Sequence, residues 1–200
     1  MKQLSIIWVM LLSLLSSFNA IGSEFKIDKS YYIENVKNEG KTYLLNVVAN
    51  IATRMYIHNK SSLRISNEQR KSLDCMIKNV YLEARGEDLY GKILVSNVVQ
   101  NRMKSKHYPY SICGVIYQPH QFSWTNNKKL VNGVDVHQST KEYKESVWTG
   151  IYSVLMDGAS YTNAVSYYAP KRLNKSPSWS DSRQFAYCGS HGGHRFYVST

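Results

Sequence analysis

Two acidic residues stand close together in the run from Asn79 to Glu87, which reads NVYLEARGE. Glu83 follows apolar residues at helical spacing, so it falls at the edge of an apolar helix face. A carboxyl group that is half removed from water has a raised pKa and can act as a general acid. The alternative for Glu83 is an ordinary solvated charge, or an ion pair with Arg85.

Two predicted helices position this run. The residues SNEQ at 66–69 have the form of a capping box, which predicts a helix that starts at Ser66. Its apolar positions follow at helical spacing: Leu73, Met76, Ile77, Val80 and Ala84. Gly86 offers a C-terminal stop, and a second helical pattern runs from near Asp88 to Met103. Glu83 is therefore expected on the last turn of a core-facing helix.

Several short blocks occur in a fixed order between Cys75 and Trp124. They are the EARGE block at 83–87, Gly91, the pair Asn101-Arg102, Tyr108-Pro109, Cys113, Val115 and the QFSW block at 121–124. In this order they resemble the core of the SleB-type cell-wall hydrolases, a family that includes spore-cortex-lytic enzymes. A weaker resemblance continues in three later segments: Tyr167-Tyr168, Pro177-Ser178-Trp179 and Gly193 to Tyr197.

This resemblance implies both a fold and a catalytic residue. Members of the family cleave the glycan strands of peptidoglycan, and their catalytic domain is similar to lysozyme-like transglycosylase folds. We therefore expect a mainly helical α+β architecture, with a lysozyme/transglycosylase-like catalytic domain and a small β element near the C-terminus. The catalytic glutamate of the family maps to Glu83, and Glu87 is the second candidate.

The run YQPHQFSW at 117–124 is expected beside the helix that carries Glu83. Its polar residues place the aromatic side chain of Trp124 on a loop or strand edge, where an aromatic face and amide donors can hold a sugar. The predicted substrate-binding residues are Tyr117, Gln121, Ser123, Trp124 and Asn101. The expected partner is thus the glycan strand of peptidoglycan.

A single acid suffices for the lytic transglycosylase reaction that the resemblance implies. The acid protonates the bond between N-acetylmuramic acid and N-acetylglucosamine, and the 6-hydroxyl of the sugar displaces the leaving group. A water-using muramidase needs a second carboxylate, about 5–5.5 Å away if retaining and about 6.5–9.5 Å away if inverting. Glu87 would supply it, at helical i+4 spacing, if the helix continues through Gly86. No metal and no cofactor is expected.

The segment CGSHGGH at 188–194 also resembles a metal-ligand cluster, through Cys188, His191 and His194. Such a cluster would suit a zinc peptidase or an N-acetylmuramoyl-L-alanine amidase. However, the chain lacks the HExxH signature, and glycines beside histidines are typical of a tight turn, here one that enters a last strand at Arg195–Val198. A GxSxG motif is also missing. The zinc enzymes and a non-catalytic wall-binding protein remain the alternatives.

Residues 1–22 have the layout of a secretory signal peptide. Lys2 precedes an apolar run from Leu4 to Leu15, and small residues follow up to Gly22. The run is shorter than the roughly twenty residues that span a bilayer, so we expect no stable membrane span after processing. Export to the periplasm, the cell wall or the medium argues against a nucleic-acid partner, although the chain has a formal net charge of +11.

The rest of the chain suits one domain with a short extension. Residues 23–64 form the extension, in which apolar residues from Tyr43 to Met55 predict one helix, preceded by a linker around residues 38–40. Residues 65–200 form the catalytic domain. In this part a long helix is expected from Tyr143 to Leu155, and a short strand at Ala164–Tyr168.

Three cysteines lie in the part of the chain that is expected to be exported, where oxidation is permitted. This number gives one disulfide and one odd thiol. Cys75 with Cys113 is the first pairing considered, because it would tie the front of the first predicted helix to the loop before QFSW. Cys113 with Cys188 is the other.

Overall fold

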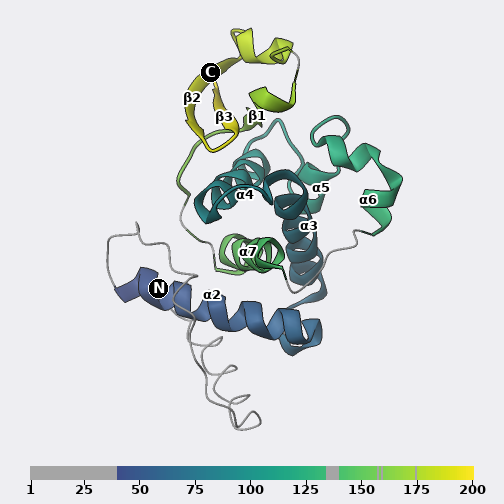
Figure 1. The fold of residues 1–200 in the computed structure, drawn as a ribbon, viewed down its shortest axis with the longest axis vertical. Coiled ribbons are helices and arrows are strands. Elements are labelled where there is room, and N and C mark those ends of the chain that lie inside the picture. The colour runs from purple at the N-terminus through teal and green to yellow at the C-terminus, as the bar shows by residue number, and fades with distance from the viewer. Residues whose placement is uncertain (1–39, 134–139, 157, 159, 174) are drawn as a thin grey trace.

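The computed structural model describes residues 40–133, 140–156, 158, 160–173 and 175–200. The predicted signal peptide and most of the predicted linker lie outside these residues. Helices form the body of the molecule, and a small sheet lies at one end (Figure 1). The longer helices are α2 (Gly40–His58), α3 (Asn67–Ala84), α4 (Leu89–Lys104) and α7 (Lys141–Gly150), which continues into one π-helical turn, η4 (Ile151–Leu155).

Helix α3 begins where the capping box predicts it. The Ser66 hydroxyl accepts a hydrogen bond from the Gln69 backbone N–H (3.1 Å), and the Gln69 side chain accepts one from the Ser66 N–H (2.9 Å). These two bonds satisfy donors that the first helical turn leaves open. All five predicted apolar positions of this helix are buried. The helix ends at Ala84, so Glu83 lies on its last turn, as expected.

Helix α4 is buried along most of its length. Every residue from Gly91 to Gln100 is buried, including Lys92. The Lys92 ammonium donates to the Glu145 carboxylate of α7 (2.8 Å) and to the carbonyl oxygen of Glu87. A buried cation is tolerated only with such partners. Lys92 therefore ties α4 both to α7 and to the loop that joins α3 to α4.

Helix α2 shares its core with the rest of the molecule. One hydrophobic cluster contains Tyr56 of α2, Ile77 of α3 and Trp148 of α7. The Trp148 ring stacks on Tyr152, with ring centroids 4.9 Å apart. The predicted extension helix thus exists. This helix of the 23–64 extension packs on helices of the 65–200 segment in one shared core.

Three short helical segments pack on α3 around a second cluster. They are α5 (Ile112–Ile116), η3 (Ser123–Asn126) and α6 (Lys128–Asn132). This second cluster includes Val80 of α3, Val115 of α5 and Phe122, which directly precedes η3. A disulfide joins Cys75 of α3 to Cys113 of α5, which confirms the first predicted pairing. Cys188 is an exposed free thiol.

The sheet has three antiparallel strands in the order β1-β3-β2. They are β1 (Ser166–Tyr168), β2 (Phe185–His191) and β3 (His194–Ser199). The predicted tight turn is the turn between β2 and β3, at Gly192-Gly193. Three 3-10 turns complete the described elements: η2 (Lys60–Ser62), η5 (Pro170–Arg172) and η6 (Ser178–Asp181). The expected mainly helical α+β class with a small β element is confirmed.

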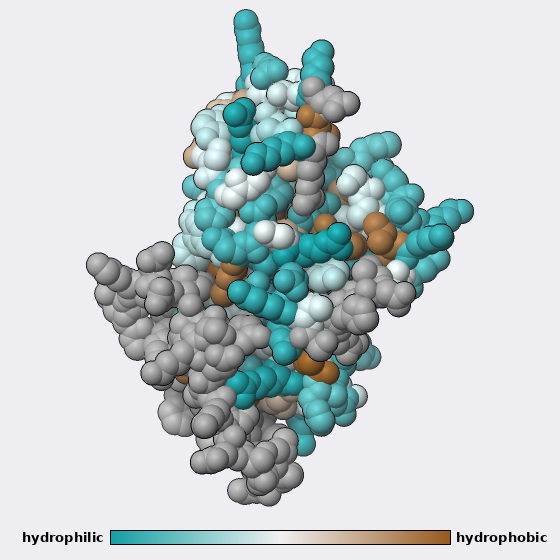
Figure 2. Space-filling view, in the orientation of Figure 1, coloured by the Kyte–Doolittle hydropathy of each residue, from teal (hydrophilic) through white to brown (hydrophobic). Residues whose placement is uncertain are grey.

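Figure 2 shows the hydropathy of one face of the molecule. In the coloured part of this face hydrophilic side chains predominate, and apolar side chains form small separate spots. Among the described residues, no helix combines the length and the apolar character needed to cross a bilayer.

Candidate active site

Glu83 lies where three elements meet. Its side chain projects from the last turn of α3, and the residue is partly buried. The hydroxyl of Tyr167, on β1, donates a hydrogen bond to Glu83 Oε2 (3.4 Å). These two residues are 84 positions apart in the sequence. The carboxylate is thus held between the helical body and the sheet.

Arg102 of α4 is the third member of this group. It is 5% exposed, and its Nε donates to the carbonyl oxygen of Val165, directly before β1 (2.6 Å). Its guanidinium lies over the rings of Tyr108 and Phe122. Burial lowers the pKa of Arg102, while the nearby Tyr108, Tyr167 and Glu83 oppose that shift. Glu83 therefore has a buried cation close by, and its surroundings are less apolar than its position on the helix suggests.

This arrangement suits general acid–base chemistry at one carboxyl group. A partly buried carboxyl can give a proton to a leaving oxygen and then take a proton from an attacking hydroxyl. The phenol of Tyr167 restricts the direction in which the carboxyl points, because it occupies one of its oxygens. Neither Tyr167 nor Arg102 was predicted as a site residue, although both stand in segments that carry the family resemblance.

Glu87 has a different environment from the one predicted. The helix does not continue through Gly86: it ends at Ala84, and the Glu87 N–H donates to the Ala84 carbonyl oxygen. The Glu87 side chain, 14% exposed, accepts from the Gly193 N–H at 3.2 Å for each oxygen and lies 3.5 Å from His194 Nδ1. The condition for the i+4 relation between Glu83 and Glu87, a helix that continues through Gly86, is therefore not met.

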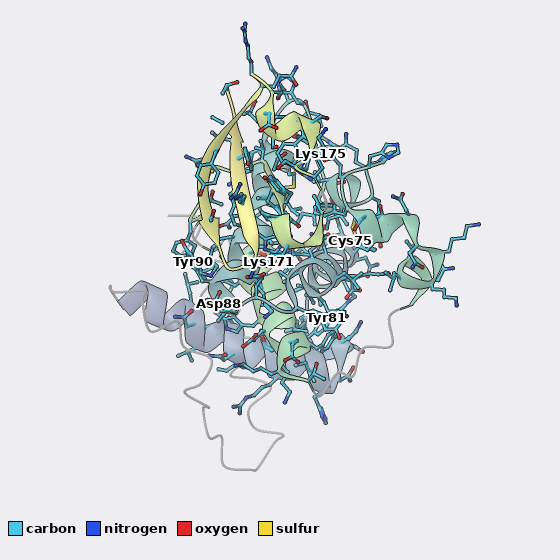
Figure 3. The ribbon with its side chains drawn as sticks, turned by 45° about the horizontal axis from the view of Figure 1, so that its top comes forward. Cys75, Tyr81, Asp88, Tyr90, Lys171 and Lys175 are labelled. Carbon is cyan, nitrogen blue, oxygen red and sulfur yellow. A yellow bond between two sulfur atoms is a disulfide. The ribbon has the colours of Figure 1, made fainter. Side chains whose placement is uncertain are left out.

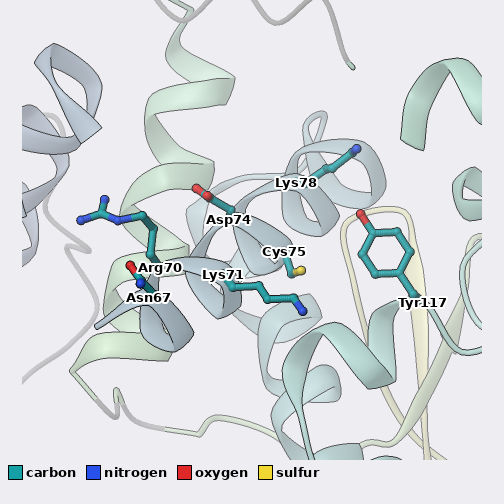
Figure 4. Close-up of a pocket in the computed structure, with 7 residues that line it drawn as sticks. All are labelled: Asn67, Arg70, Lys71, Asp74, Cys75, Lys78 and Tyr117. Atoms are coloured by element: carbon teal, nitrogen blue, oxygen red, sulfur yellow. The ribbon is translucent and has the colours of Figure 1, made fainter. Parts of the chain in front are cut away.

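Three of the predicted substrate-binding residues are accessible. Ser123 is exposed, Gln121 is half-buried, and Tyr117 is 41% exposed. Tyr117 lines a cleft of about 440 Å³ on the outer face of α3 (Figure 4). The other residues that line this cleft are Asn67, Arg70, Lys71, Asp74, Cys75 and Lys78.

Trp124 is a core residue, contrary to the prediction that it offers an open face to a sugar. It is 5% exposed and belongs to the second hydrophobic cluster. Its indole N–H donates to Asn79 Oδ1 (3.0 Å), and the Tyr117 ring meets its edge. The error has a physical reason: the polar neighbours of Trp124 point outward from a 3-10 turn, and the large ring fills the space beneath it.

Asn101 also has a structural place. Its side-chain nitrogen donates to the carbonyl oxygens of Thr162 (2.8 Å) and Ala164 (2.9 Å). These bonds fix the segment that leads into β1, and they occupy the amide donors that were expected to contact a sugar. Asn101 thus helps to hold the segment before β1, the strand that carries Tyr167.

The two histidines of the CGSHGGH segment pair with acids instead of converging on one point. His191 Nε2 lies 2.8 Å from Asp88 Oδ1, and its ring meets the ring of Tyr90 edge-on. Asp88 and Tyr90 stand together at the start of α4 (Figure 3). His194 faces Glu87. In the described part of the chain, no group of three or more histidine, cysteine or acidic side chains is placed to hold a metal ion.

Comparison with known proteins supplies the identification. The family model described as Cell Wall Hydrolase matches residues 86–197, which is more than half of the chain. The chain belongs to this family. The match covers Glu87, Arg102, Tyr167 and His194, and it begins three residues after Glu83.

Individual cell wall hydrolases are similar over shorter stretches. The chain is 32% identical over 65 residues to a spore cortex-lytic enzyme of Bacillus cereus, and 37% identical over 54 residues to that of Oceanobacillus iheyensis. The corresponding enzyme of Bacillus subtilis is 43% identical over 44 residues. These stretches cover 32%, 27% and 22% of this chain, and 25%, 20% and 14% of the relatives. The chain thus spans only a quarter or less of the curated relatives that it matches.

Two solved structures were also found. One is titled as the catalytic domain of the germination-specific lytic transglycosylase SleB from Bacillus anthracis, with 26% identity and a TM-score of 0.47 over 66% of this chain and 96% of that domain. The other is the catalytic domain of the Bacillus cereus SleB protein, with 23% identity and a TM-score of 0.49 over 67% of this chain and 93% of that domain.

Proposed function

We propose that this cell wall hydrolase is an exported enzyme that cleaves the glycan strand of peptidoglycan as a lytic transglycosylase. Membership of the family supports action on the cell wall. The name of the relatives, spore cortex-lytic enzyme, supports lysis as the activity. The signal peptide predicted at residues 1–22 supports export. The transglycosylase reaction is the one that the sequence resemblance implies.

The observation that carries this proposal is the placement of Glu83 against Tyr167, with Arg102 close by. A glycosidic bond breaks when its oxygen receives a proton as the bond to the anomeric carbon lengthens. Glu83 in its protonated form gives that proton to the oxygen that leaves with N-acetylglucosamine. The carboxylate formed in this step is stabilised by the Tyr167 hydroxyl and by the Arg102 charge.

The same carboxylate completes the reaction. The 6-hydroxyl of N-acetylmuramic acid attacks the anomeric carbon, forms the 1,6-anhydro ring and loses its proton to Glu83. The acid is thereby restored, and no water is consumed. A single carboxyl group serves both steps, which agrees with the engagement of Glu87 by the Gly193 N–H. Tyr117, Gln121 and Ser123 remain our candidates for contacts with the sugar, because their side chains are accessible.

The proposal is tested by digesting purified peptidoglycan and analysing the products by mass spectrometry. We expect muropeptides with 1,6-anhydro-muramyl ends. Reducing muramic acid ends would show a muramidase instead, and released peptides would show an amidase or peptidase. Either result would overturn the proposed reaction, and the absence of any product at high enzyme concentration would favour a non-catalytic wall-binding protein.

Glu83→Gln tests the assignment of the acid. The variant keeps the size and polarity of the side chain but cannot give a proton, so we expect turnover to fall by about 10²–10⁴-fold with an unchanged far-UV circular dichroism spectrum. The matched control is Glu68→Gln, an exposed glutamate in the first turn of the same helix, which should keep wild-type turnover. If Glu83→Gln keeps more than about a tenth of the activity, the acid is another residue.

A further inference from the structure

Tyr167 packs against two hydrophobic clusters, but the strand that carries it is short. It lies on β1, which has three residues, and in the described sheet β1 is an edge strand paired with β3. Opposite it in the register is Phe196, and its ring contacts both Phe196 and His194. The position of the Tyr167 hydroxyl beside Glu83 therefore depends on where the start of β3 is held.

The start of β3 is held by Glu87. His194, the first residue of β3, is 3% exposed, and its ring meets the Tyr167 ring edge-on, with centroids 5.0 Å apart at 88°. On its other side, His194 Nδ1 lies 3.5 Å from Glu87 Oε1. The neighbouring Gly193 N–H donates to the same carboxylate. The Glu87 side chain thus contacts both Gly193, the last residue of the turn, and His194, the first residue of β3.

The turn is closed tightly over this carboxylate. Gly192 has a φ of 52°, and a Cβ atom at this position would come within 1.6 Å of Glu87 Oε2. The backbone of Glu87 is fixed in turn, because its carbonyl oxygen accepts from the buried Lys92 ammonium, which also binds Glu145. Next to it, Asp88 binds His191 at the other end of the turn. Glu87 is therefore a fixed point in the helical body.

We propose that Glu87 and His194 are positioning residues that set Tyr167 beside Glu83. The path runs from the Glu87 carboxylate to the His194 ring, then through the Tyr167 ring to its hydroxyl, and ends at Glu83 Oε2. It gives Glu87 a role that requires an acceptor of hydrogen bonds and takes no part in proton transfer. Only its effect on turnover rests on the proposed function of Glu83.

The position of Tyr167 can be measured without any activity. With 3-fluorotyrosine placed at residue 167 alone, we expect Glu87→Ala to shift the ¹⁹F resonance. Glu87→Gln should restore it towards the wild-type position, because the amide oxygen still accepts from the Gly193 N–H. Glu68→Ala, at an exposed site on α3, is the control and should leave the resonance in place. An unchanged resonance in folded Glu87→Ala would overturn the proposal.

Kinetics on peptidoglycan give the second measurement. Glu87→Ala should lower kcat by about ten- to a hundredfold with little change in KM, as expected for a displaced active-site group, and Glu87→Gln should recover most of this loss. In a Tyr167→Phe background, Glu87→Ala should cause little further loss, because its effect passes through that hydroxyl. Equal losses in Glu87→Gln and Glu87→Ala would show that the charge itself is needed, and would overturn the proposal.

Two further outcomes separate a failure of this proposal from a folding defect and from a failure of the proposed function. If Glu87→Ala does not fold, His194→Ala replaces it, since it removes the ring between Glu87 and Tyr167; it should shift the ¹⁹F resonance and lower kcat. Wild-type kcat in His194→Ala would overturn the proposal. If the wild-type protein cleaves no glycan, the proposed function fails, whereas the ¹⁹F comparison still decides whether Glu87 positions Tyr167.

Discussion

Glu83 and Glu87 differ in environment because the helix ends between them. Glu83, on the last turn of α3, is partly exposed beside a phenol and a buried guanidinium. Glu87, past the helix end, accepts from a backbone N–H and lies against a buried histidine. A carboxylate with an open side can exchange protons with a ligand, whereas one enclosed by a turn is a structural acceptor. We therefore propose different roles for the two glutamates of the EARGE block.

Trp124 allows a direct test at the residue scale. Because its ring is buried, Trp124→Ala should lower the free energy of unfolding by about 3–5 kcal/mol, measured by urea denaturation. Trp124→Phe keeps most of the packing but leaves Asn79 Oδ1 without its indole donor, so it should cost about 1–3 kcal/mol. Unchanged stability together with weaker binding to peptidoglycan would instead restore Trp124 as a sugar-binding residue.

Apolar spacing placed Glu83 on a helix and the family resemblance singled it out as the candidate acid, but neither indicated its partners. Its place on α3 followed from apolar spacing, which reports what lies along one helix. Tyr167 and Arg102 reach it through contacts between distant segments, and no local pattern encodes such contacts. The burial of Trp124 escaped prediction for the same reason, since polar neighbours in the sequence do not reveal which way a ring points.

At the scale of elements, local sequence signals such as helix caps determined which helices and strands could be predicted. Helices α3 and α4 begin at residues with capping side chains, Ser66 and Asp88, and both were predicted with their approximate ends. Strand β2 was not predicted, because its residues are exposed or half-buried throughout and so lack the alternation that marks a strand with one buried face. A strand of this kind forms because β3 offers it backbone hydrogen bonds.

The disulfide connects α3 to α5, and its effect on stability can be estimated. Cys75 and Cys113 are 38 residues apart, and closing a loop of this length in the unfolded chain corresponds to about 4 kcal/mol at 25 °C. We expect Cys75→Ser/Cys113→Ser to lower the free energy of unfolding by up to this amount, measured by urea denaturation. Cys188→Ser is the control and should have little effect, because this cysteine is exposed and is not part of a disulfide. A loss below about 1 kcal/mol in the double variant would contradict the estimate.

The contact between Asp88 and His191 should make the turn sensitive to acid. Partial burial tends to raise the pKa of Asp88, but the hydrogen bonds from the Gly91 N–H and His191 outweigh it, so the pKa lies below its usual value. Asp88 therefore contributes stability above about pH 4, its unfolded pKa, and this contribution is lost as pH falls through the lower folded value.

Thermal melts between pH 5 and pH 2 check this expectation. Asp88→Asn keeps an N-cap for α4 but does not titrate, so its melting temperature should fall less steeply in acid than that of the wild type. If the melting temperatures of the two proteins fall equally steeply with decreasing pH, Asp88 contributes nothing to the loss of stability in acid.

The whole molecule is strongly basic. The formal charge is +11, and without Lys2, which lies in the predicted signal peptide, it is +10 (11 − 1). Peptidoglycan carries carboxylates on its peptide stems, so attraction between opposite charges should assist binding.

We therefore expect binding and lysis to weaken as sodium chloride rises from about 0.1 M to 1 M, because the Debye length shrinks from about 10 Å to about 3 Å. Co-sedimentation of the Glu83→Gln variant with insoluble peptidoglycan measures binding without digestion. Binding that is constant over this range would make the charge incidental to substrate capture.

Helix α2 and the candidate active site lie on opposite sides of the molecule. The helix packs on α7 at the end away from the sheet, whereas Glu83 and Tyr167 meet at the junction with the sheet (Figure 1). An anchor attached ahead of Gly40 would therefore hold the molecule from behind, with its reactive side turned outward. The distance over which the enzyme could act would then depend on the length of the tether. A short tether would confine cleavage to glycan strands close to the point of attachment, and a longer tether would extend the area that one molecule can digest.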